Sequence, residues 1–391
     1  METLYKKDSK GKIREWNIKI DGDGDYWGIS TSDGLHGGKI KDPIFKKAIP
    51  NNLFKTSIDK ANAMKQSAID KKLRSNYFES IDAIKDEDIL FMPTGCPSGM
   101  IWKEWKDKSH VVYPALASPK LDGSKCYSTW REDRVFLNTR SAKEHLNFRH
   151  IEEALTDFYE ENPNIVLDGE VYSHEYRDRF EELQSIFRQE TPTDEERALS
   201  AEVARFYIYD SIDLNKPNQT ARERQSLLSW VNHKITSEHI IAWFSKDVRT
   251  EKEYDAYHEE CMDGGFEGTV LKIADAPYVQ RKNKNVMKRK PKFDCEFRVI
   301  GIVEGTGTCK GIAAGVTIDL QYVDGMNITH RDMLAEDFQD AGMAKGWNHA
   351  MLKKMLINKL EYIGKMATIE YGGMTAYGKL RFPKFKALRT D

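Results

Sequence analysis

The first fifty residues alternate apolar and polar side chains around turn signals, which is the pattern of a half-buried β-hairpin. An alternating run from Trp16 to Ile20 is followed by Asp21-Gly-Asp-Gly24, and a second run begins at Tyr26. From Ser57 to about Ile84 the apolar residues recur near helical spacing. This pattern predicts a small β-plus-helix module over residues 1–90.

The next segment breaks the periodicity. Met92-Pro-Thr-Gly-Cys-Pro-Ser-Gly99 contains two prolines and two glycines, which is typical of a loop or linker. We therefore predict a linker over residues 91–109.

Short strands alternate with helices from 110 to 293. One helix is expected at Ile151–Glu160, where apolar residues fall at i, i+3, i+4 and i+7. The expected strands are Val111–Ala115, Val135–Asn138, Ile165–Leu167, Phe206–Tyr209 and Thr269–Ile273.

From Glu296 the pattern becomes mostly strand. Expected strands are Phe297–Val303, Val316–Tyr322 and Met366–Tyr371, with one helix near 347–360. We predict a small β-barrel over residues 294–391.

Composition narrows the class of protein. At ~150 residues per domain, 391 residues correspond to two or three domains. Lys and Arg total 60 against 62 Asp and Glu, which excludes a histone-like basic protein and an acidic tail protein. No apolar window is long enough for a membrane-spanning helix, and the first eight residues lack the apolar run of a signal peptide. Five dispersed cysteines without a C-x-x-C pair indicate reduced thiols and exclude a zinc knuckle, so we expect a cytoplasmic protein.

Two segments resemble binding loops superficially. A calcium loop starting at Asp21 would need Gly at its sixth position and Glu at its twelfth, where this chain has Tyr26 and Ser32. A hairpin turn is favoured there. Gly305-Thr-Gly-Thr-Cys-Lys310 lacks the spacing of a phosphate-binding loop, so we predict a turn of the barrel.

The tetrad Lys-x-Asp-Gly occurs twice, at Lys19 and at Lys120, and its surroundings distinguish the copies. Only the second is followed by an ordered set of short motifs. These are Thr139-Arg140, Leu167-Asp-Gly-Glu170, Phe206-Tyr-Ile-Tyr-Asp210, Glu267-Gly-Thr-Val-Leu-Lys272, Lys288-Arg-Lys290 and Arg381-Phe-Pro-Lys-Phe385.

In this ordered set the chain resembles the ATP-dependent DNA ligases of the covalent nucleotidyltransferase superfamily, over roughly 110–391. The resemblance implies an α+β fold: an adenylation domain of antiparallel sheets with helices over 110–293, then a C-terminal OB-fold β-barrel. Residues 1–90 faintly resemble small WGR-type domains, and we hypothesise that they add duplex contacts. A purely structural module is an equal alternative.

The resemblance also implies residue roles. Lys120 is the adenylated nucleophile, Glu170 and Glu267 are carboxylates that face the metal or the ribose, and Tyr209 or Tyr207 stacks on adenine. The implied nucleotide-binding set is Ser118, Pro119, Lys120, Leu121, Lys125, Arg140, Glu170, Tyr209, Lys272, Lys288 and Lys290. The residues implied in closure and nucleic-acid contact are Arg381, Lys384, Lys386 and Arg389.

The chemistry of these residue types supports the same assignment. A lysine of pKa ~10.4 is neutral only about one part in a thousand near pH 7.4. We expect surrounding cations, namely Lys272, Lys288, Lys290 and Arg140, to lower the pKa of Lys120. Alternation should place Lys288 and Lys290 on one face of a strand and Arg289 on the other.

Three positions depart from the family pattern. Lys125 stands where Arg is usual, Val286 where Trp is usual, and Ala387 lies in a partly basic last motif. The first replacement weakens any bidentate phosphate contact at that position.

The implied activity is the sealing of nicks in duplex DNA by a monomer, with ATP and Mg²⁺ (Mn²⁺ as a substitute), in a bacterial or phage-infected cell. Alternatives are an RNA ligase, an mRNA-capping guanylyltransferase and a catalytically silent nucleic-acid-binding protein. The last would use the basic segment Arg281–Arg298, which has eight Lys and Arg against two acidic residues.

Overall fold

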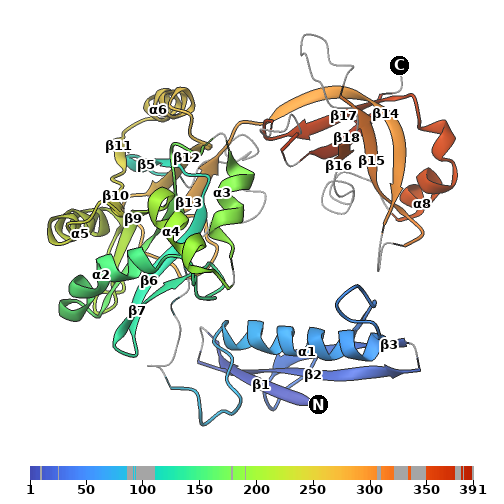
Figure 1. Ribbon diagram of the computed structural model, residues 1–391, viewed down its shortest axis with the longest axis horizontal. Coiled ribbons are helices and arrows are strands. Elements are labelled where there is room, and N and C mark those ends of the chain that lie inside the picture. Colours follow the sequence, from blue (N-terminus) through green and yellow to red (C-terminus); the bar gives the residue numbers. More distant parts are fainter. Residues whose placement is uncertain are drawn as a thin grey trace. The chain divides into compact units, whose positions relative to one another are not determined.

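The computed structural model describes most of the chain, in two compact units (Figure 1). One unit is Met1–Pro93 with Asn138–Glu144, and the other is Thr94–Leu137 with His145–Asp391. The described residues are 1–8, 11–24, 26–85, 91, 93, 111–177, 179–189, 191–305, 310–320, 333–335, 349–374, 380, 381 and 383–389.

The first unit is an antiparallel sheet in the order β1-β2-β3-β4, with one helix against it. Its strands are β1 (Glu2–Lys7), β2 (Ile13–Asp23), β3 (Tyr26–Leu35) and β4 (Ile44–Lys47), and the helix is α1 (Ser57–Leu73). Leu4, Trp16, Ile18 and Ile29 pack with Ile69 of α1. The expected hairpin is confirmed, because Asp23 pairs with Tyr26 across the β2–β3 turn.

The helix of this unit is shorter than the sequence pattern predicts. It ends at Leu73 instead of continuing to Ile84. Asn76 adopts a positive φ of 63°, and Phe78 forms a bridge with Tyr5 of β1. The backbone bonds that a helix would need are thus made to the sheet.

The second unit begins with two sheets, and the chain passes between them several times through strands and helices. One sheet has the order β10-β9-β8-β6-β7, the other the order β11-β5-β12-β13. All pairings given for these sheets are antiparallel except the parallel pair β10 and β9. The strands are β5 (Ala115–Lys120), β6 (Ser124–Arg131), β7 (Arg134–Asn138), β8 (Ile165–Tyr172), β9 (Arg205–Asp213), β10 (Ile240–Ala242), β11 (Lys246–Val248), β12 (Gly268–Ile273) and β13 (Val286–Arg289).

Helices supply the rest of the core around these sheets (Figure 1). Residues of α2, α3, α4 and α5 pack with the five-stranded sheet, and residues of α6 pack with the four-stranded sheet. The helices are α2 (Arg149–Glu161), α3 (Phe180–Phe187), α4 (Asp194–Val203), α5 (Ala221–Lys234) and α6 (Glu251–Asp263).

The strand expected at Val111–Ala115 is misplaced, since β5 begins only at Ala115. Pro114 precedes that residue and has no N–H to donate to a ladder, so pairing starts after it. The strand then runs to Lys120, which becomes its last residue.

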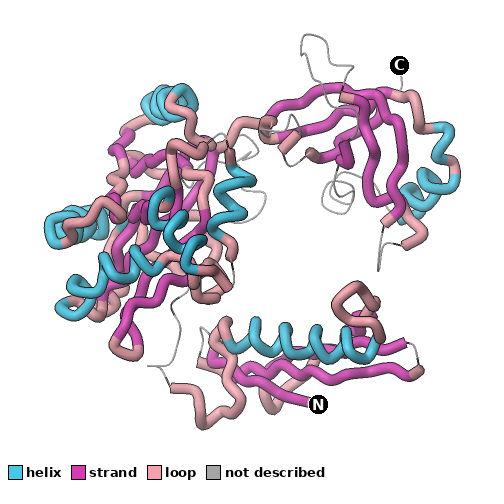
Figure 2. The backbone as a smooth tube through the Cα atoms, in the orientation of Figure 1, coloured by secondary structure: helices cyan, strands magenta, loops and turns pink. Residues whose placement is uncertain are grey.

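A third sheet has the order β16-β15-β14-β17-β18, and its strands curve strongly (Figure 2). Its elements are β14 (Phe293–Glu304), β15 (Ala313–Asp319), β16 (Met333–Ala335), α8 (His349–Ile357), a short 3₁₀ helix Lys359–Glu361, β17 (Met366–Tyr371) and β18 (Lys384–Leu388). Leu352 and Met355 of α8 pack against the sheet. The OB-fold assignment stays a prediction, and the predicted turn at 306–309 lies outside the described residues, as does Tyr322.

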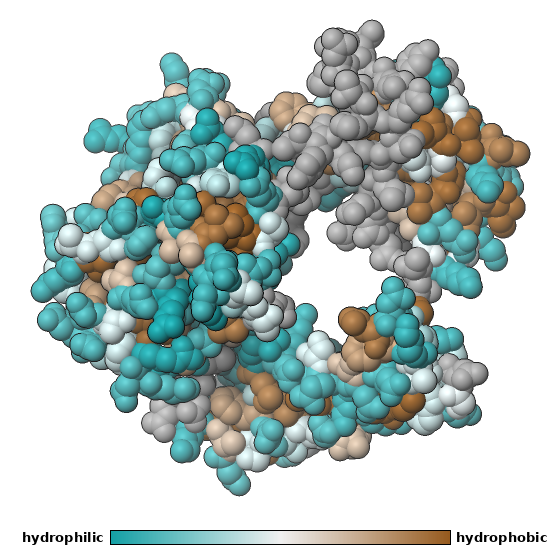
Figure 3. All heavy atoms as spheres, in the orientation of Figure 1, coloured by the Kyte–Doolittle hydropathy of each residue, from teal (hydrophilic) through white to brown (hydrophobic). Residues whose placement is uncertain are grey.

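Hydrophilic side chains cover most of the face shown in Figure 3, interrupted by smaller hydrophobic patches. Within the described ranges, no helix combines the length and the apolar character that a bilayer crossing requires.

Candidate functional site

The second Lys-x-Asp-Gly copy lies where the sheet that contains β5 meets the sheet that contains β6 and β8. Lys120 is the last residue of β5, and its carbonyl accepts a hydrogen bond from the backbone N–H of Glu267 at 3.1 Å. The Lys120 amine contacts the Glu267 carboxylate and donates to the carbonyl of Leu121 at 3.1 Å. About a fifth of the Lys120 side chain remains exposed. The neighbours Ser118 and Leu121 are buried, and Pro119 pairs with Thr269 of β12.

The first copy lies in a different environment. Lys19 is on the β2–β3 hairpin, where its amine is 3.2 Å from Asp21. Nearly half of its side chain is exposed. The structure therefore gives Lys19 the setting of an ordinary surface ion pair.

Glu267 is shared between two cations. Its carboxylate contacts the amines of Lys120 and Lys290, and its own side chain is only a tenth exposed. Burial raises the pKa of Glu267, but the two lysines outweigh burial and hold it below its ordinary value. One Glu267 oxygen, Oε2, is buried and contacts the Lys120 ammonium.

The pKa of Lys120 differs from the expectation. Burial lowers it, but the carboxylates Glu267, Glu170 and Asp122 outweigh burial, so the pKa is raised. The expected ring of cations is wrong as an account of this amine, because the charges that dominate around it are negative. Lys290 behaves as expected for a lysine near another one, since burial and the Lys120 charge lower its pKa.

Glu170 is the one half-buried residue of β8, and every other residue of that strand is buried. Its Oε1 accepts a hydrogen bond from the backbone N–H of Gly123 at 3.1 Å. Burial raises the pKa of Glu170 despite the opposing charges of Lys120 and Lys125. The Asp-Gly-Glu and Lys-x-Asp-Gly motifs therefore meet in space.

Two glycines permit this meeting. A Cβ on Gly123 would lie 2.2 Å from the carbonyl oxygen of Val171, and a Cβ on Gly169 would lie 2.1 Å from that of Tyr207. Both contacts are with backbone, which cannot move aside as a flexible side chain could. Only glycine fits at either position.

The chemistry of Glu170 and Glu267 fits a magnesium ion, because Mg²⁺ prefers carboxylate oxygens and both side chains lie beside Lys120. Across the described part of the chain, however, no three His, Cys, Asp or Glu side chains are grouped closely enough to hold a metal. The metal role of the two glutamates stays a prediction.

Lys125 connects the Asp-Gly-Glu strand to Tyr209. Its amine contacts the buried carboxylate of Asp168 and donates to the Tyr209 hydroxyl at 2.7 Å. The other Asp168 oxygen accepts from the Tyr278 hydroxyl at 2.6 Å. The lysine that replaces the family's arginine is thus engaged within the protein.

Lys272 is a second cation beside Tyr209. Its amine donates to the Tyr209 carbonyl at 2.9 Å and lies 3.0 Å from the carboxylate of Asp210. Asp210 also accepts from Arg224 at 2.7 Å. Burial raises the pKa of Asp210, but Lys272 and Arg224 outweigh burial and lower it.

The two candidate adenine-stacking tyrosines have different surroundings. Tyr207 is buried and packs against Tyr172 and Trp243, with ring centroids 5.4 and 5.3 Å away. Tyr209 is half-buried, with the amines of Lys125 and Lys272 at 4.8 and 5.1 Å from its ring centre. Tyr209 is therefore the more accessible ring.

The side chains of strand β13 alternate between its two faces, as the sequence predicts. Met287 is in the core, and Arg289 on the same face lies over the ring of Tyr254 and pairs with Asp255. Lys288 alternates with these residues and is half-buried, and Lys290 follows the strand beside Glu267. Arg140 is exposed in a segment that belongs to the first compact unit, so its assignment stays a prediction.

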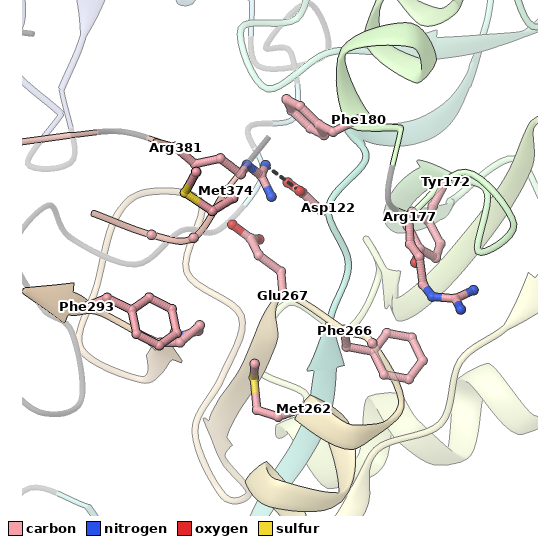
Figure 4. A pocket seen from close by; sticks show the side chains of 14 residues that line it. Asp122, Tyr172, Arg177, Phe180, Met262, Phe266, Glu267, Phe293, Met374 and Arg381 are labelled. Carbon is pink, nitrogen blue, oxygen red and sulfur yellow. Dashed lines mark hydrogen bonds and ion pairs between the residues drawn. The ribbon is translucent and has the colours of Figure 1, made fainter. Parts of the chain in front are cut away.

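Of the four residues predicted for closure, only Arg381 is placed near Lys120. Its guanidinium is 2.5 Å from the carboxylate of Asp122 and 4.7 Å from the ring centre of Phe180 (Figure 4). Lys384 is exposed. The other two are paired within the third sheet, Lys386 with Asp294 and Glu370, and Arg389 with Glu296.

A cavity of about 400 Å³ adjoins this ion pair. Figure 4 shows Glu267 and Asp122 at one side of it, with Phe266, Phe293 and Met262 along the wall. It combines charged groups with an apolar lining, as ligand pockets commonly do.

Sequence reasoning missed five partners of the predicted residues, of which Asp168, Asp210 and Arg224 are buried. They are Asp122, Asp168, Asp210, Arg224 and Tyr278. The three carboxylates, Asp122, Asp168 and Asp210, lie inside motifs quoted above. Their place in those motifs was the only sequence feature that could have marked them as site residues. Arg224 and Tyr278 belong to no quoted motif.

Comparisons with known proteins agree with this geometry. Residues 109–290 match the family model described as "ATP dependent DNA ligase domain". A probable DNA ligase of Dictyoglomus turgidum is 26% identical over 248 residues, which is 58% of this chain and 41% of the relative. The DNA ligase of enterobacteria phage T6 is 23% identical over 231 residues, 49% of this chain and 47% of the relative. The chain thus matches less than half the length of either relative.

Solved structures show the same fold at low identity. One described as "Pmar-Lig_PreS3" has a TM-score of 0.62 at 19% identity, covering 86% of this chain and 73% of that chain. A structure from work on Lig E DNA ligases has a TM-score of 0.58 at 18% identity, covering 77% and 100%. Lys120, Glu170, Glu267 and Lys290 all fall inside the range that the family model matches. Residues 109–290 therefore form the part of this chain that is similar to the ATP-dependent DNA ligase domain.

Proposed function

We propose that this chain is an ATP- and Mg²⁺-dependent DNA ligase that seals 5′-phosphate/3′-hydroxyl nicks in duplex DNA as a monomer. The observation that carries the proposal is the Lys120 amine, held at the end of β5 against Glu267, which also holds Lys290. The family match and the ligase relatives support the same reaction class.

In the first step the Lys120 nitrogen attacks the α-phosphorus of ATP. A P–N bond forms, the bond from the α-phosphorus to the bridging oxygen breaks, and pyrophosphate leaves with the bonding electrons. Glu267 orients the amine, and the ammonium must lose a proton to solvent before its nitrogen can attack. Lys290 lies beside the reacting group and stabilises the added negative charge.

Tyr209 is the proposed platform for adenine, because it is the half-buried tyrosine and is fixed at two points. Lys125 holds its hydroxyl and Lys272 its carbonyl. Mg²⁺ held by Glu170 and Glu267 would neutralise the departing pyrophosphate. Arg381 lies just before β18 of the third sheet and pairs with Asp122. This ion pair connects the third sheet to the surroundings of Lys120.

In the later steps the AMP passes to the 5′-phosphate of the nick, and the 3′-hydroxyl then attacks that phosphorus and releases AMP. No side chain forms a covalent bond in the sealing step, so its rate depends on positioning and electrostatics.

The test is protein labelling without nucleic acid. The wild-type chain is mixed with Mg²⁺ and α-labelled ATP or GTP, and acid-labile label on the protein is measured. We expect label from ATP that is lost at least a thousandfold in Lys120→Ala and retained in Lys19→Ala, the matched lysine of the other tetrad.

Each remaining outcome selects another function. Label from GTP indicates a capping enzyme, and no label from either nucleotide indicates a silent nucleic-acid-binding protein. Labelled protein is then given nicked DNA or nicked RNA, and sealing of RNA alone would indicate an RNA ligase.

A further inference from the structure

The first compact unit contains a cation-rich cluster at the end of its helix. On the helix-covered face of the sheet, Leu4 and Trp16 belong to the apolar core, and the next pair on that face is Lys6 and Arg14. The chain leaves α1 at Leu73 and returns to pair with Tyr5. Apolar packing therefore gives way to charge at this end of the unit.

The cations gather around one aromatic ring. The Lys72 amine lies 4.4 Å from the ring centre of Tyr77 and 4.9 Å from that of Trp16. The Lys6 amine lies 5.6 Å from the same Tyr77 ring and donates to the carbonyl of Ser75 at 2.6 Å. We call Lys6, Arg14, Lys41, Lys72 and Tyr77 the Tyr77 cluster.

Only one carboxylate balances these four cations within the described residues. Asp33 lies 3.6 Å from Arg14 and 3.0 Å from Lys41. For Lys72, burial lowers the pKa, Asp33 raises it, and Lys6, Lys71 and Lys41 lower it further. Burial also lowers the pKa of Lys6. The balance is an excess of positive charge on partly buried amines.

Neither the end of helix α1 nor the cation–π contacts neutralise this excess of positive charge. The carboxyl end of a helix contributes only about half a negative charge. Cation–π contacts explain why the Lys6 and Lys72 amines lie against Tyr77, but they add no counter-charge. Folding therefore brings like charges together in a place where an anion would relieve their repulsion.

The composition of the unit favours a polyanion as that anion. Residues 1–85 contain 17 Lys and Arg against 12 Asp and Glu, in a chain whose total charge is −2. Lys41 is largely exposed, so the cluster is open to solvent on one side. A DNA backbone presents a row of phosphates, each of which can pair with ammonium and guanidinium groups.

We propose that the Tyr77 cluster binds backbone phosphate of duplex DNA, so that the first compact unit helps to hold the substrate. The choice of DNA rests on the proposed ligase function. The proposal assigns a role to residues outside the matched ligase domain, which begins at residue 109.

The test compares two double variants of the full chain that remove the same charge. Lys6→Ala/Lys72→Ala removes the two cluster lysines that lie against the Tyr77 ring, whereas Lys55→Ala/Lys60→Ala removes two lysines from near the start of α1. Lys60 is a good match for Lys72, because it also lies over an aromatic ring, with its amine 5.0 Å from the ring centre of Phe54. Binding to a labelled nicked duplex is measured over a series of salt concentrations.

We expect the cluster variant to bind about tenfold more weakly at 150 mM salt. Its slope of log affinity against log salt should be smaller by about one to two, because each lost phosphate contact removes about 0.9. Lys55→Ala/Lys60→Ala should retain affinity and slope within about twofold. Lys6→Arg/Lys72→Arg should bind like the wild type, since it keeps both charges.

Two results would overturn the proposal: wild-type affinity and slope in Lys6→Ala/Lys72→Ala, or an equal loss in the Lys55/Lys60 variant. If the cluster variant melts below the assay temperature, Lys6→Gln/Lys72→Gln replaces it under the same criteria. ATP labelling of Lys120 is recorded in parallel. Absent labelling in the wild type counts against the ligase function, while the salt slope judges the Tyr77 cluster alone.

Discussion

Two charge clusters in the second unit share one arrangement, a carboxylate between two cations, and differ in how much of each reaches solvent. In the first, Asp210 holds Arg224 and Lys272, and all three side chains are at most 8% exposed. In the second, Glu267 holds Lys120 and Lys290, which are 21% and 28% exposed.

Both clusters also contact the backbone, so exposure is the difference between them. Arg224 and Lys272 donate to the carbonyls of Gln219 and Tyr209. In the Glu267 cluster, Lys120 donates to the carbonyl of Leu121. The Asp210 cluster is therefore closed to solvent and supports the strand β9, whereas the Glu267 cluster is open to solvent at both lysines.

The largest expected effect is on stability, in the closed cluster. Asp210→Ala leaves two buried cations without their carboxylate, and should lower the free energy of unfolding by about 3–5 kcal/mol. The exposed pair of Lys246 and Glu260 is the control, since Glu260→Ala should cost less than about 1 kcal/mol. Urea denaturation measures both.

If Asp210→Ala were as stable as Glu260→Ala, the Asp210 cluster would contribute no more to stability than an exposed ion pair, and the distinction between the clusters would be wrong. A pH series gives a second measure. Because the pKa of Asp210 is lowered on folding, its stabilising contribution is present above the ordinary value of 3.8 and lost as the pH falls through the folded value.

The next effect concerns the pH dependence of labelling at the open cluster. Because carboxylates raise the pKa of Lys120 above its ordinary value of 10.5, the amine stays protonated at neutral pH. The rate of labelling by saturating ATP should therefore rise about tenfold per pH unit from pH 6 to 9. A plateau near pH 7.5 would instead indicate a lowered pKa and the cation ring that the sequence suggested.

The same shift has a consequence for stability, with the sign reversed relative to Asp210. A raised lysine pKa stabilises the fold fully below 10.5 and loses that contribution only as the pH rises through the folded value. The urea midpoint should thus be unaffected by Lys120 from pH 7 to 9, while labelling changes. A fall in the midpoint over that range, absent in Lys120→Met, would contradict this.

The smallest effect concerns Tyr209, which contacts Lys272 of the closed cluster and also Lys125. Tyr209→Phe removes the hydroxyl that Lys125 holds, and should raise KM for ATP about fivefold with little change in kcat, as expected for one hydrogen bond of about 1 kcal/mol. Lys125→Met should do the same, and the double variant should be no worse than the more impaired single variant. Additive losses would show that the two residues act separately.

The sequence predicted the parts of the fold that depend on local pattern. Hairpin β2–β3, strands such as β12 and helix α2 fall where periodicity placed them. The end of α1 could not be predicted, because it depends on pairing of Phe78 with a strand over seventy residues earlier.

At the site, ordered motifs indicated Lys120, Glu170 and Glu267, and the structure brings these three together. The sign of the Lys120 pKa shift could not be read in the same way. It depends on which charges are nearest in space, and Lys272, which the motifs group with Lys120, is instead bound to Asp210. A motif therefore indicates which residues belong to a site, but it does not show which of their charged groups pair with each other.

The two glycines beside Val171 and Tyr207 have a wider consequence for recognising such proteins. Each of the motifs Lys-x-Asp-Gly and Asp-Gly-Glu contains one residue proposed to take part in the chemistry, Lys120 or Glu170. Each also contains a glycine that allows two backbone segments to approach closely. A descendant that lost its lysine and glutamate but kept both glycines would retain the scaffold, with positions 120 and 170 still adjacent. Retained glycines beside altered chemistry would therefore mark an inactive relative rather than an unrelated fold.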